Sequence, residues 1–206
     1  MAGDAMNKAI LTCALPMLAL LSACDMGGGN AASNNGAAQG DLAGARIGGP
    51  FTLTDQDGKQ VRWDDFKGQY RLVYFGYTYC PDVCPMVLSH LKKGMLDLKE
   101  QAKDVQVLFI SIDPERDTHE KLKDYLPYFY PTFVGLTGSV NDITKVAKQY
   151  GVGYFKQYVE SVEGYFMAHI DAVFLVDQEG RYIGRYKTKW DMEKLITDIQ
   201  LLLDSG

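Results

Sequence analysis

Two apolar runs rich in β-branched and aromatic residues, separated by a helical pattern, most constrain the fold of this chain. The runs cover residues 71–77 and 105–112, and neither alternates cleanly between apolar and polar residues, as expected of strands buried on both faces. Between them, apolar residues recur at helical spacing and predict a helix over 85–103. Strand, helix and strand in this order predict a right-handed crossover between parallel strands.

The rest of the chain from residue 47 onward predicts a layered α/β domain. The order of elements suggests a thioredoxin-like sandwich over 47–206, in which helices flank a central mixed sheet and a β-hairpin is added at the amino-terminal end. The further expected elements are a hairpin at 51–54 and 61–63, a helix at 118–128, a strand at 133–136, a helix at 141–150, a hairpin at 172–176 and 181–186, and a helix at 192–203.

Two cysteines, Cys80 and Cys84, lie where the first central strand passes into the helix that follows it. Unpaired backbone N–H groups and the positive end of the helix dipole favour thiolates at such a junction. If the first helical turn begins near Cys80, the i, i+4 spacing puts both sulfurs on one face, with β-carbons about 5–6 Å apart. The pair can then form a disulfide or share one metal ion.

Three histidines are candidates for a third metal ligand. His90 lies farther along the cysteine helix and faces away from the sulfurs, so we expect a surface or packing role. His119 lies near the carboxyl ends of the parallel strands, where a role at the start of a helix is expected. His169 precedes a strand at 170–176 that should run antiparallel to the cysteine strand and begin at its cysteine end. We therefore predict His169, rather than the other two, as the ligand that joins the thiols.

Two thiolates and an imidazole suit a soft or borderline ion, with copper as the first choice and zinc as the second. A trigonal site with three ligands fits Cu(I) and leaves an approach open for transfer, whereas structural zinc usually has four closed ligands. We expect one copper ion per domain, as Cu(I) or Cu(II). Met86 and Met95 repeat at helical spacing and are expected in the core rather than at the metal.

The first 24 residues resemble the signal peptide of a bacterial lipoprotein. An apolar run over 9–21 follows Lys8, and the sequence Leu-Ser-Ala-Cys that ends at Cys24 resembles a lipobox. The run is short for a transmembrane helix. On this interpretation Cys24 carries lipid that anchors the protein to a membrane, and Cys13 is removed with the signal. The alternative is an ordinary signal peptide with an incidental cysteine.

A lipid anchor at Cys24 would place the domain in the periplasm of a bacterial cell envelope. Asp25 resembles an inner-membrane retention signal, so the inner membrane is the expected location. Residues 25–46 are mostly Gly, Ala and Asn and predict a flexible tether. The formal net charge of −5 argues against a nucleic-acid partner, which needs a basic face, and leaves proteins or small ions as partners.

Three ordered motifs resemble signatures of the Sco/SenC family. They are FGYTYCPDVCP at 75–85, FISIDPERDT at 109–118 and VGLTG at 134–138. The resemblance implies a thioredoxin-like fold and copper bound through Cys80, Cys84 and His169. It also implies assembly of the dinuclear copper centre of cytochrome c oxidase, with the copper-binding subunit of the oxidase or another copper chaperone as partner.

One departure from that family concerns the residue before the histidine. Members commonly carry aspartate there, whereas this chain has Ala168. Because ligand histidines usually lean on a hydrogen-bond acceptor, the missing acid could change how the His169 imidazole is oriented.

These residues suit three functions. The first is a membrane-tethered copper metallochaperone that uses the two thiols and His169. The second is an enzyme, a thiol–disulfide oxidoreductase that keeps the copper-binding cysteines of a client reduced and needs the thiols but not His169. The third is a peroxidase, which is favoured only by Thr78 lying two residues before Cys80.

Overall fold

The computed structural model describes residues 47–160 and 164–205. The predicted signal peptide at 1–24, with Cys24, and the predicted tether at 25–46 lie outside these residues. Among the described helices, none has both the length and the apolar character needed to cross a membrane.

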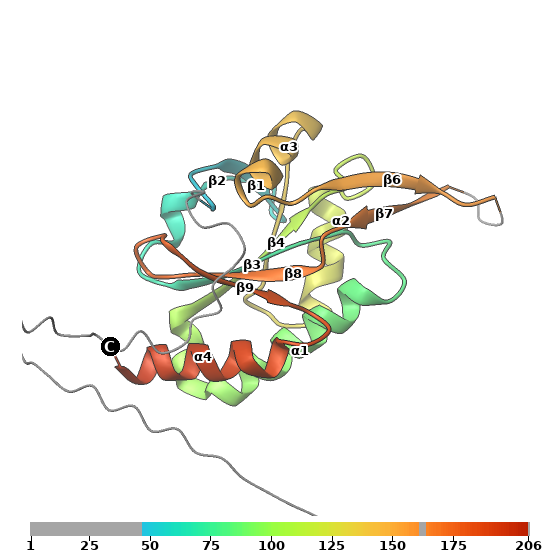
Figure 1. Ribbon diagram of the computed structural model, residues 1–206. Coiled ribbons are helices and arrows are strands. Elements are labelled where there is room, and N and C mark those ends of the chain that lie inside the picture. Colours follow the sequence, from blue (N-terminus) through green and yellow to red (C-terminus); the bar gives the residue numbers. More distant parts are fainter. Residues whose placement is uncertain (1–46, 161–163, 206) are drawn as a thin grey trace, which may run out of the picture. The chain divides into compact units, whose positions relative to one another are not determined.

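A seven-stranded mixed sheet forms the centre of the domain (Figure 1). Its order is β2 (Gln60–Arg62), β1 (Thr52–Asp55), β5 (Val134–Thr137), β4 (Val105–Ser111), β3 (Tyr70–Gly76), β8 (Ala172–Val176) and β9 (Tyr182–Lys187). β3, β4 and β5 are parallel, while β1 and β8 run antiparallel to their neighbours. The predicted mixed sheet and the amino-terminal hairpin of β1 and β2 are therefore confirmed.

Helices cover both faces of this sheet, which is why its central strands are apolar throughout. The helices are α1 (Val83–Leu98), α2 (His119–Tyr125), α3 (Val140–Gln149) and α4 (Met192–Ser205). Figure 1 shows α1 and α4 together below the sheet and α3 above it. Gly94 of α1 allows a close approach of α4, because a β-carbon there would overlap the side chain of Ile196. The predicted thioredoxin-like arrangement of flanking helices is confirmed.

The cysteine helix is shorter than predicted. α1 ends at Leu98, because Lys99 adopts a positive φ of 52°, and a 3₁₀ helix (Lys99–Asp104) completes the crossover to β4. Met95 is buried as expected, but the prediction for Met86 is wrong, since its side chain is 38% exposed. The buried stripe of α1 runs through Cys84, Val87 and Leu91, and Met86 lies outside it.

A second sheet of two strands, absent from the sequence-based prediction, projects from the body of the domain (Figure 1). Its antiparallel strands are β6 (Tyr154–Tyr158) and β7 (Tyr165–His169). Of their residues only Met167 is buried, so the hydrophobic pattern that would predict strands is weak. His169 therefore ends a strand of this hairpin, and β8 begins at Ala172, as the predicted hairpin had it and two residues after the strand start assumed in the argument for His169.

Candidate metal centre

The chain leaves the sheet after Gly76 and enters α1 at Val83, so the helix begins later than the thiol spacing suggested. Cys80 lies in the preceding turn, where its N–H donates to the Tyr77 carbonyl at 3.3 Å. The N–H of Cys84 in turn donates to Sγ of Cys80 at 3.3 Å. The Cys80 sulfur thus satisfies one of the free N–H groups of the first helical turn, and this brings the two thiols together although only Cys84 is helical.

The two thiols differ in exposure and in acidity. Both are free; Cys84 is fully buried and Cys80 is half-buried. The hydrogen bond from the Cys84 thiol, followed by backbone N–H groups, lowers the pKa of Cys80 to about 5 despite its partial burial. The same hydrogen bond and burial raise the pKa of Cys84. At neutral pH the metal-free domain therefore holds a Cys80 thiolate beside a neutral Cys84 thiol, and Cys80 is the more nucleophilic sulfur.

Close packing at the end of β3 places the Cys84 sulfur. A β-carbon on Gly76 would lie 3.1 Å from Sγ of Cys84 and 2.8 Å from the ring of Phe109, so only glycine fits without a shift. On the other side, the hydroxyl of the buried Tyr74 lies 3.5 Å from the same sulfur. The buried thiol is thus held between strand and helix.

The structure brings His169 to the cysteines. Its Nε2 lies 4.0 Å from Sγ of Cys84, and its ring packs edge-on against the rings of Tyr74 and Tyr77. Its Nδ1 lies 3.0 Å from the Ile170 carbonyl, which can only accept, so Nδ1 carries the proton and Nε2 is free for a metal. A backbone carbonyl therefore orients the imidazole, and an acid at the position of Ala168 is not needed for this.

The motif at 111–117 fixes the cysteine loop to β4. The buried carboxylate of Asp117 accepts from the Thr78 N–H at 2.9 Å, from the Thr78 hydroxyl at 2.6 Å and from the Ser111 hydroxyl at 2.7 Å. Burial raises the pKa of Asp117. Thr78, whose position two residues before Cys80 was the one feature that favoured a peroxidase, donates its hydroxyl to Asp117 and so helps to hold the cysteine loop.

The same motif also holds the hairpin that carries His169. Arg116 donates from Nε to Asp113 at 2.5 Å and from Nη1 to the Tyr165 carbonyl at 3.0 Å, while the Tyr165 hydroxyl donates to Asp113 at 2.8 Å. The Arg116 guanidinium also lies over the rings of Tyr165 and Tyr79, 3.8 Å and 4.7 Å from their centroids. The loop after β4 therefore fixes the position of the cysteine turn relative to β7.

The sequence supplied these supporting residues only as part of a family signature, without a role. Their signal was present, because Asp113 and Asp117 lie in the loop that follows a buried strand, at the end of the sheet where the cysteines were expected.

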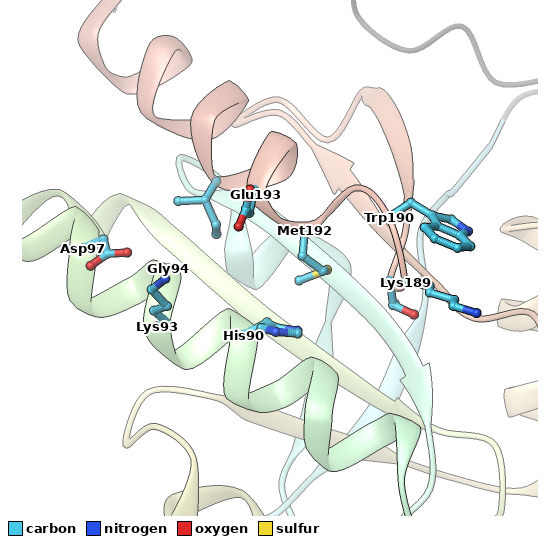
Figure 2. A pocket seen from close by; sticks show the side chains of 10 residues that line it. His90, Lys93, Gly94, Asp97, Lys189, Trp190, Met192 and Glu193 are labelled. Atoms are coloured by element: carbon cyan, nitrogen blue, oxygen red, sulfur yellow. The ribbon is translucent and has the colours of Figure 1, made fainter.

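A shallow pocket of about 340 Å³ opens over Cys80, and Pro81, Phe166, His169 and Asp171 are among its other lining residues. A larger groove of about 430 Å³ lies between α1 and the start of α4, and Figure 2 shows His90 and Trp190 on it. His90 therefore belongs to another surface, as predicted, and the larger volume does not mark the thiol site. His119 starts α2, where it packs near Gly58 and pairs with Glu120.

Two of the three predicted ligands already stand at a metal-binding separation. With bonds of about 2.3 Å to sulfur and 2.0 Å to nitrogen, ligand atoms at 120° around one ion lie about 3.7 Å apart, close to the 4.0 Å between Cys84 and His169. Among the described residues, however, no group of three or more His, Cys, Asp and Glu side chains is already arranged to hold an ion. The Cys80 sulfur accepts the Cys84 N–H at 3.3 Å, a hydrogen bond that a thiolate can keep when it binds a metal.

Comparison with known proteins leads to the same family as the sequence motifs. The sequence model of the SCO1/SenC family matches residues 39–204. This chain belongs to the SCO1/SenC family. Its relatives include "Protein SCO1 homolog 1, mitochondrial" from Arabidopsis thaliana, 39% identical over 73% of this chain and 45% of the relative. "Protein SCO2, mitochondrial" from Saccharomyces cerevisiae is 40% identical over 75% of this chain and 53% of the relative. The chain thus spans about half the length of these two SCO proteins.

Solved structures of the SCO1/SenC family share the fold. Bradyrhizobium japonicum ScoI with copper bound is 40% identical, with a TM-score of 0.69 over 75% of this chain and 98% of the other. A SCO1/SenC family lipoprotein from Bacillus anthracis is 30% identical, with a TM-score of 0.64 over 76% and 94% of the two chains. BsSco, in which a disulfide switch has been identified, is a member of the Sco family of cytochrome c oxidase assembly proteins. It is 25% identical, with a TM-score of 0.60 over 76% of this chain and 92% of the other.

Proposed function

We propose that this SCO1/SenC domain is a copper metallochaperone that binds one copper ion through Cys80, Cys84 and His169 and delivers it to the dinuclear copper centre of cytochrome c oxidase. The observation that carries the proposal is the approach of His169 Nε2 to within 4.0 Å of the Cys84 sulfur. The copper-bound structure of the related ScoI and the description of BsSco as an oxidase assembly protein support the choice of ion and client.

The chemistry of the three side chains fits a transferable copper ion. Two soft thiolates and one imidazole favour Cu(I) over hard ions, and three ligands leave one side of the ion open. Cys80 is half-buried at the pocket, whereas Cys84 is closed off behind it. Transfer would begin with a thiolate of the client replacing the half-buried Cys80, so the client's copper-binding cysteines must be reduced and deprotonated.

Removal of the imidazole tests the ligand set. We expect His169→Ala to lower copper affinity by about 100-fold or more, at or beyond the upper end of the loss for residues that only support a ligand, and to shift the sulfur-to-copper charge-transfer bands, because the third ligand is lost. Anaerobic competition with a chromophoric Cu(I) chelator and spectra of the Cu(II) form measure both effects. His90→Ala is the matched control, since His90 lies on the α1–α4 groove. Equal affinity and spectra in wild type and His169→Ala would exclude His169 as a ligand.

A second function is favoured by the unequal exposure of the thiols. The half-buried Cys80 can attack a client disulfide, forming a mixed disulfide and releasing one client thiolate. Cys84, directly behind it, then attacks the Cys80 sulfur, which releases the second client thiolate and leaves a Cys80–Cys84 disulfide. Two electrons pass to the client, and the proton lost by Cys84 balances one released thiolate.

The same variants separate the two functions. A reductase needs both thiols but not the imidazole, so reduction of a disulfide-bonded peptide that carries the client's copper-binding cysteines should persist in His169→Ala and disappear in Cys80→Ser. If reduction and copper binding are lost together in His169→Ala, the thiol–disulfide oxidoreductase function does not exist apart from copper.

We also propose that Cys24 is lipidated and anchors the domain to the inner membrane, on its periplasmic side. The lipobox-like sequence carries this proposal, and the related Bacillus anthracis protein, a lipoprotein, supports it. Cys24→Ala should move the protein from the membrane to the soluble fraction of cells expressing the full chain. Persistence of the Cys24→Ala protein in the membrane fraction would contradict a lipid anchor at this residue.

A further inference from the structure

Asp171 is a carboxylate in the pocket over Cys80 that is not among the predicted copper ligands. Asp171 lies two residues after His169, is half-buried, and lines the same pocket as Cys80 and His169. Its Oδ2 accepts a hydrogen bond from the Thr188 hydroxyl, which fixes the carboxylate from the side of β9. Because the residue before His169 is Ala168, Asp171 is the acidic residue nearest to His169 in the sequence of this segment.

Asp171 reaches the buried sulfur through Tyr74. The Tyr74 hydroxyl lies 3.4 Å from Oδ1 of Asp171 and 3.5 Å from Sγ of Cys84. A phenol has one proton, so it cannot donate fully to both acceptors at the same time. Tyr74 and Cys84 are completely buried, so water cannot replace the Tyr74 hydroxyl as a donor to the Cys84 sulfur.

We propose that Asp171 is a positioning residue of the copper site, whose negative charge acts through the Tyr74 hydroxyl on the Cys84 sulfur and weakens Cu(I) binding relative to Cu(II). This inference rests on the proposed copper function. An ionised Asp171 attracts the Tyr74 proton and leaves the Cys84 sulfur with less hydrogen bonding. The carboxylate also lies within two hydrogen-bond lengths of that sulfur, in a pocket where water screens it incompletely.

The direction of the effect of Asp171 on copper affinity follows from the net charges of the Cu(I) and Cu(II) complexes. Two thiolates with Cu(I) and a neutral imidazole carry one negative charge, whereas the same ligands with Cu(II) are neutral. A nearby fixed negative charge therefore opposes the Cu(I) complex more than the Cu(II) complex. Removal of that charge should raise the ratio of Cu(I) affinity to Cu(II) affinity by about tenfold, which corresponds to a rise of about 59 mV in a one-electron potential.

Asp171→Asn tests the charge with little change of shape, because the amide oxygen can still accept from Thr188 and Tyr74. Cu(I) affinity is measured by anaerobic chelator competition, and Cu(II) affinity by titration of the sulfur-to-copper charge-transfer band. We expect the ratio of Cu(I) affinity to Cu(II) affinity to rise about tenfold in Asp171→Asn. In Asp171→Glu, which keeps the negative charge, the ratio should stay close to that of wild type. Asp97→Asn, which removes an exposed carboxylate from α1, is the matched control and should leave the ratio unchanged.

A double-mutant cycle tests the path through Tyr74. If Asp171 acts through this hydroxyl, the effects of Asp171→Asn and Tyr74→Phe on the affinity ratio should not add. Thermal unfolding of the metal-free variants checks that each is folded. An unchanged ratio in a folded Asp171→Asn, or strict additivity with Tyr74→Phe, would overturn this inference while leaving the copper function intact. Failure of the wild-type domain itself to bind copper would instead remove the proposed function.

Discussion

Replacement of Cys84 by serine is expected to lower the Cu(I) affinity of the domain by more than about a hundredfold, beyond the range typical of residues that only support a ligand. The thiolate is the metal-binding form of cysteine, and the serine hydroxyl stays neutral at physiological pH. Chelator competition at neutral pH measures the loss. Serine is slightly smaller than cysteine and therefore fits this fully buried position without a clash. We expect the domain to remain folded, and circular dichroism would verify this.

Cys80→Ser provides the comparison for this prediction. It removes the half-exposed thiol and should also abolish tight binding, but without disturbing the packing between Tyr74, Gly76 and α1. Affinities for Cu(I) that stay within a factor of about three of wild type in either folded variant would contradict a site built on both thiols.

Replacement of Asp117 by alanine is expected to reduce the free energy of unfolding by about 2–4 kcal/mol. Its carboxylate accepts three hydrogen bonds in a fully buried position, and its loss strands the Thr78 N–H, which cannot turn toward another acceptor. The hydroxyl of Thr78 and the hydroxyl of Ser111 can each rotate toward another acceptor, so their loss of Asp117 costs less. Urea unfolding monitored by circular dichroism measures the effect, and the exposed Asp97→Ala serves as a control with little expected change.

The acidity of Asp117 adds a pH dependence with a definite sign. Burial raises its pKa above the ordinary value of 3.8, so the folded state binds this proton more tightly than the unfolded state. Its contribution to stability is therefore largest below 3.8 and falls as the pH rises through the folded pKa. The unfolding free energy of wild type minus that of Asp117→Asn should decrease over this window. A difference that increases with pH would show that hydrogen bonding, rather than burial, dominates.

Much of the fold could be predicted from residue patterns, because its central elements bury continuous apolar surface. The runs that became β3 and β4 and the stripe along α1 each carried a strong signal. The hairpin of β6 and β7 did not, since Phe155 and Tyr158 are exposed and the two strands bury little. A pattern of burial cannot reveal strands that face solvent.

For the site, the sequence by itself determined the chemistry. The two thiols at a strand-to-helix junction, the distal His169 and the ordered family motifs are properties of residue type and order. It also located them at one end of the sheet, because the crossover rules make the strands around the cysteine helix parallel and the strand after His169 was expected to run antiparallel to them.

Only the tertiary structure decided how these side chains are held. The start of α1 at Val83, the Ile170 carbonyl behind the imidazole and the placement of Asp171 against Tyr74 depend on contacts between segments far apart in the chain or on local backbone geometry. Hydrogen bonds form at separations set to a few tenths of an ångström by the packing of the whole domain, and residue order alone does not specify such distances.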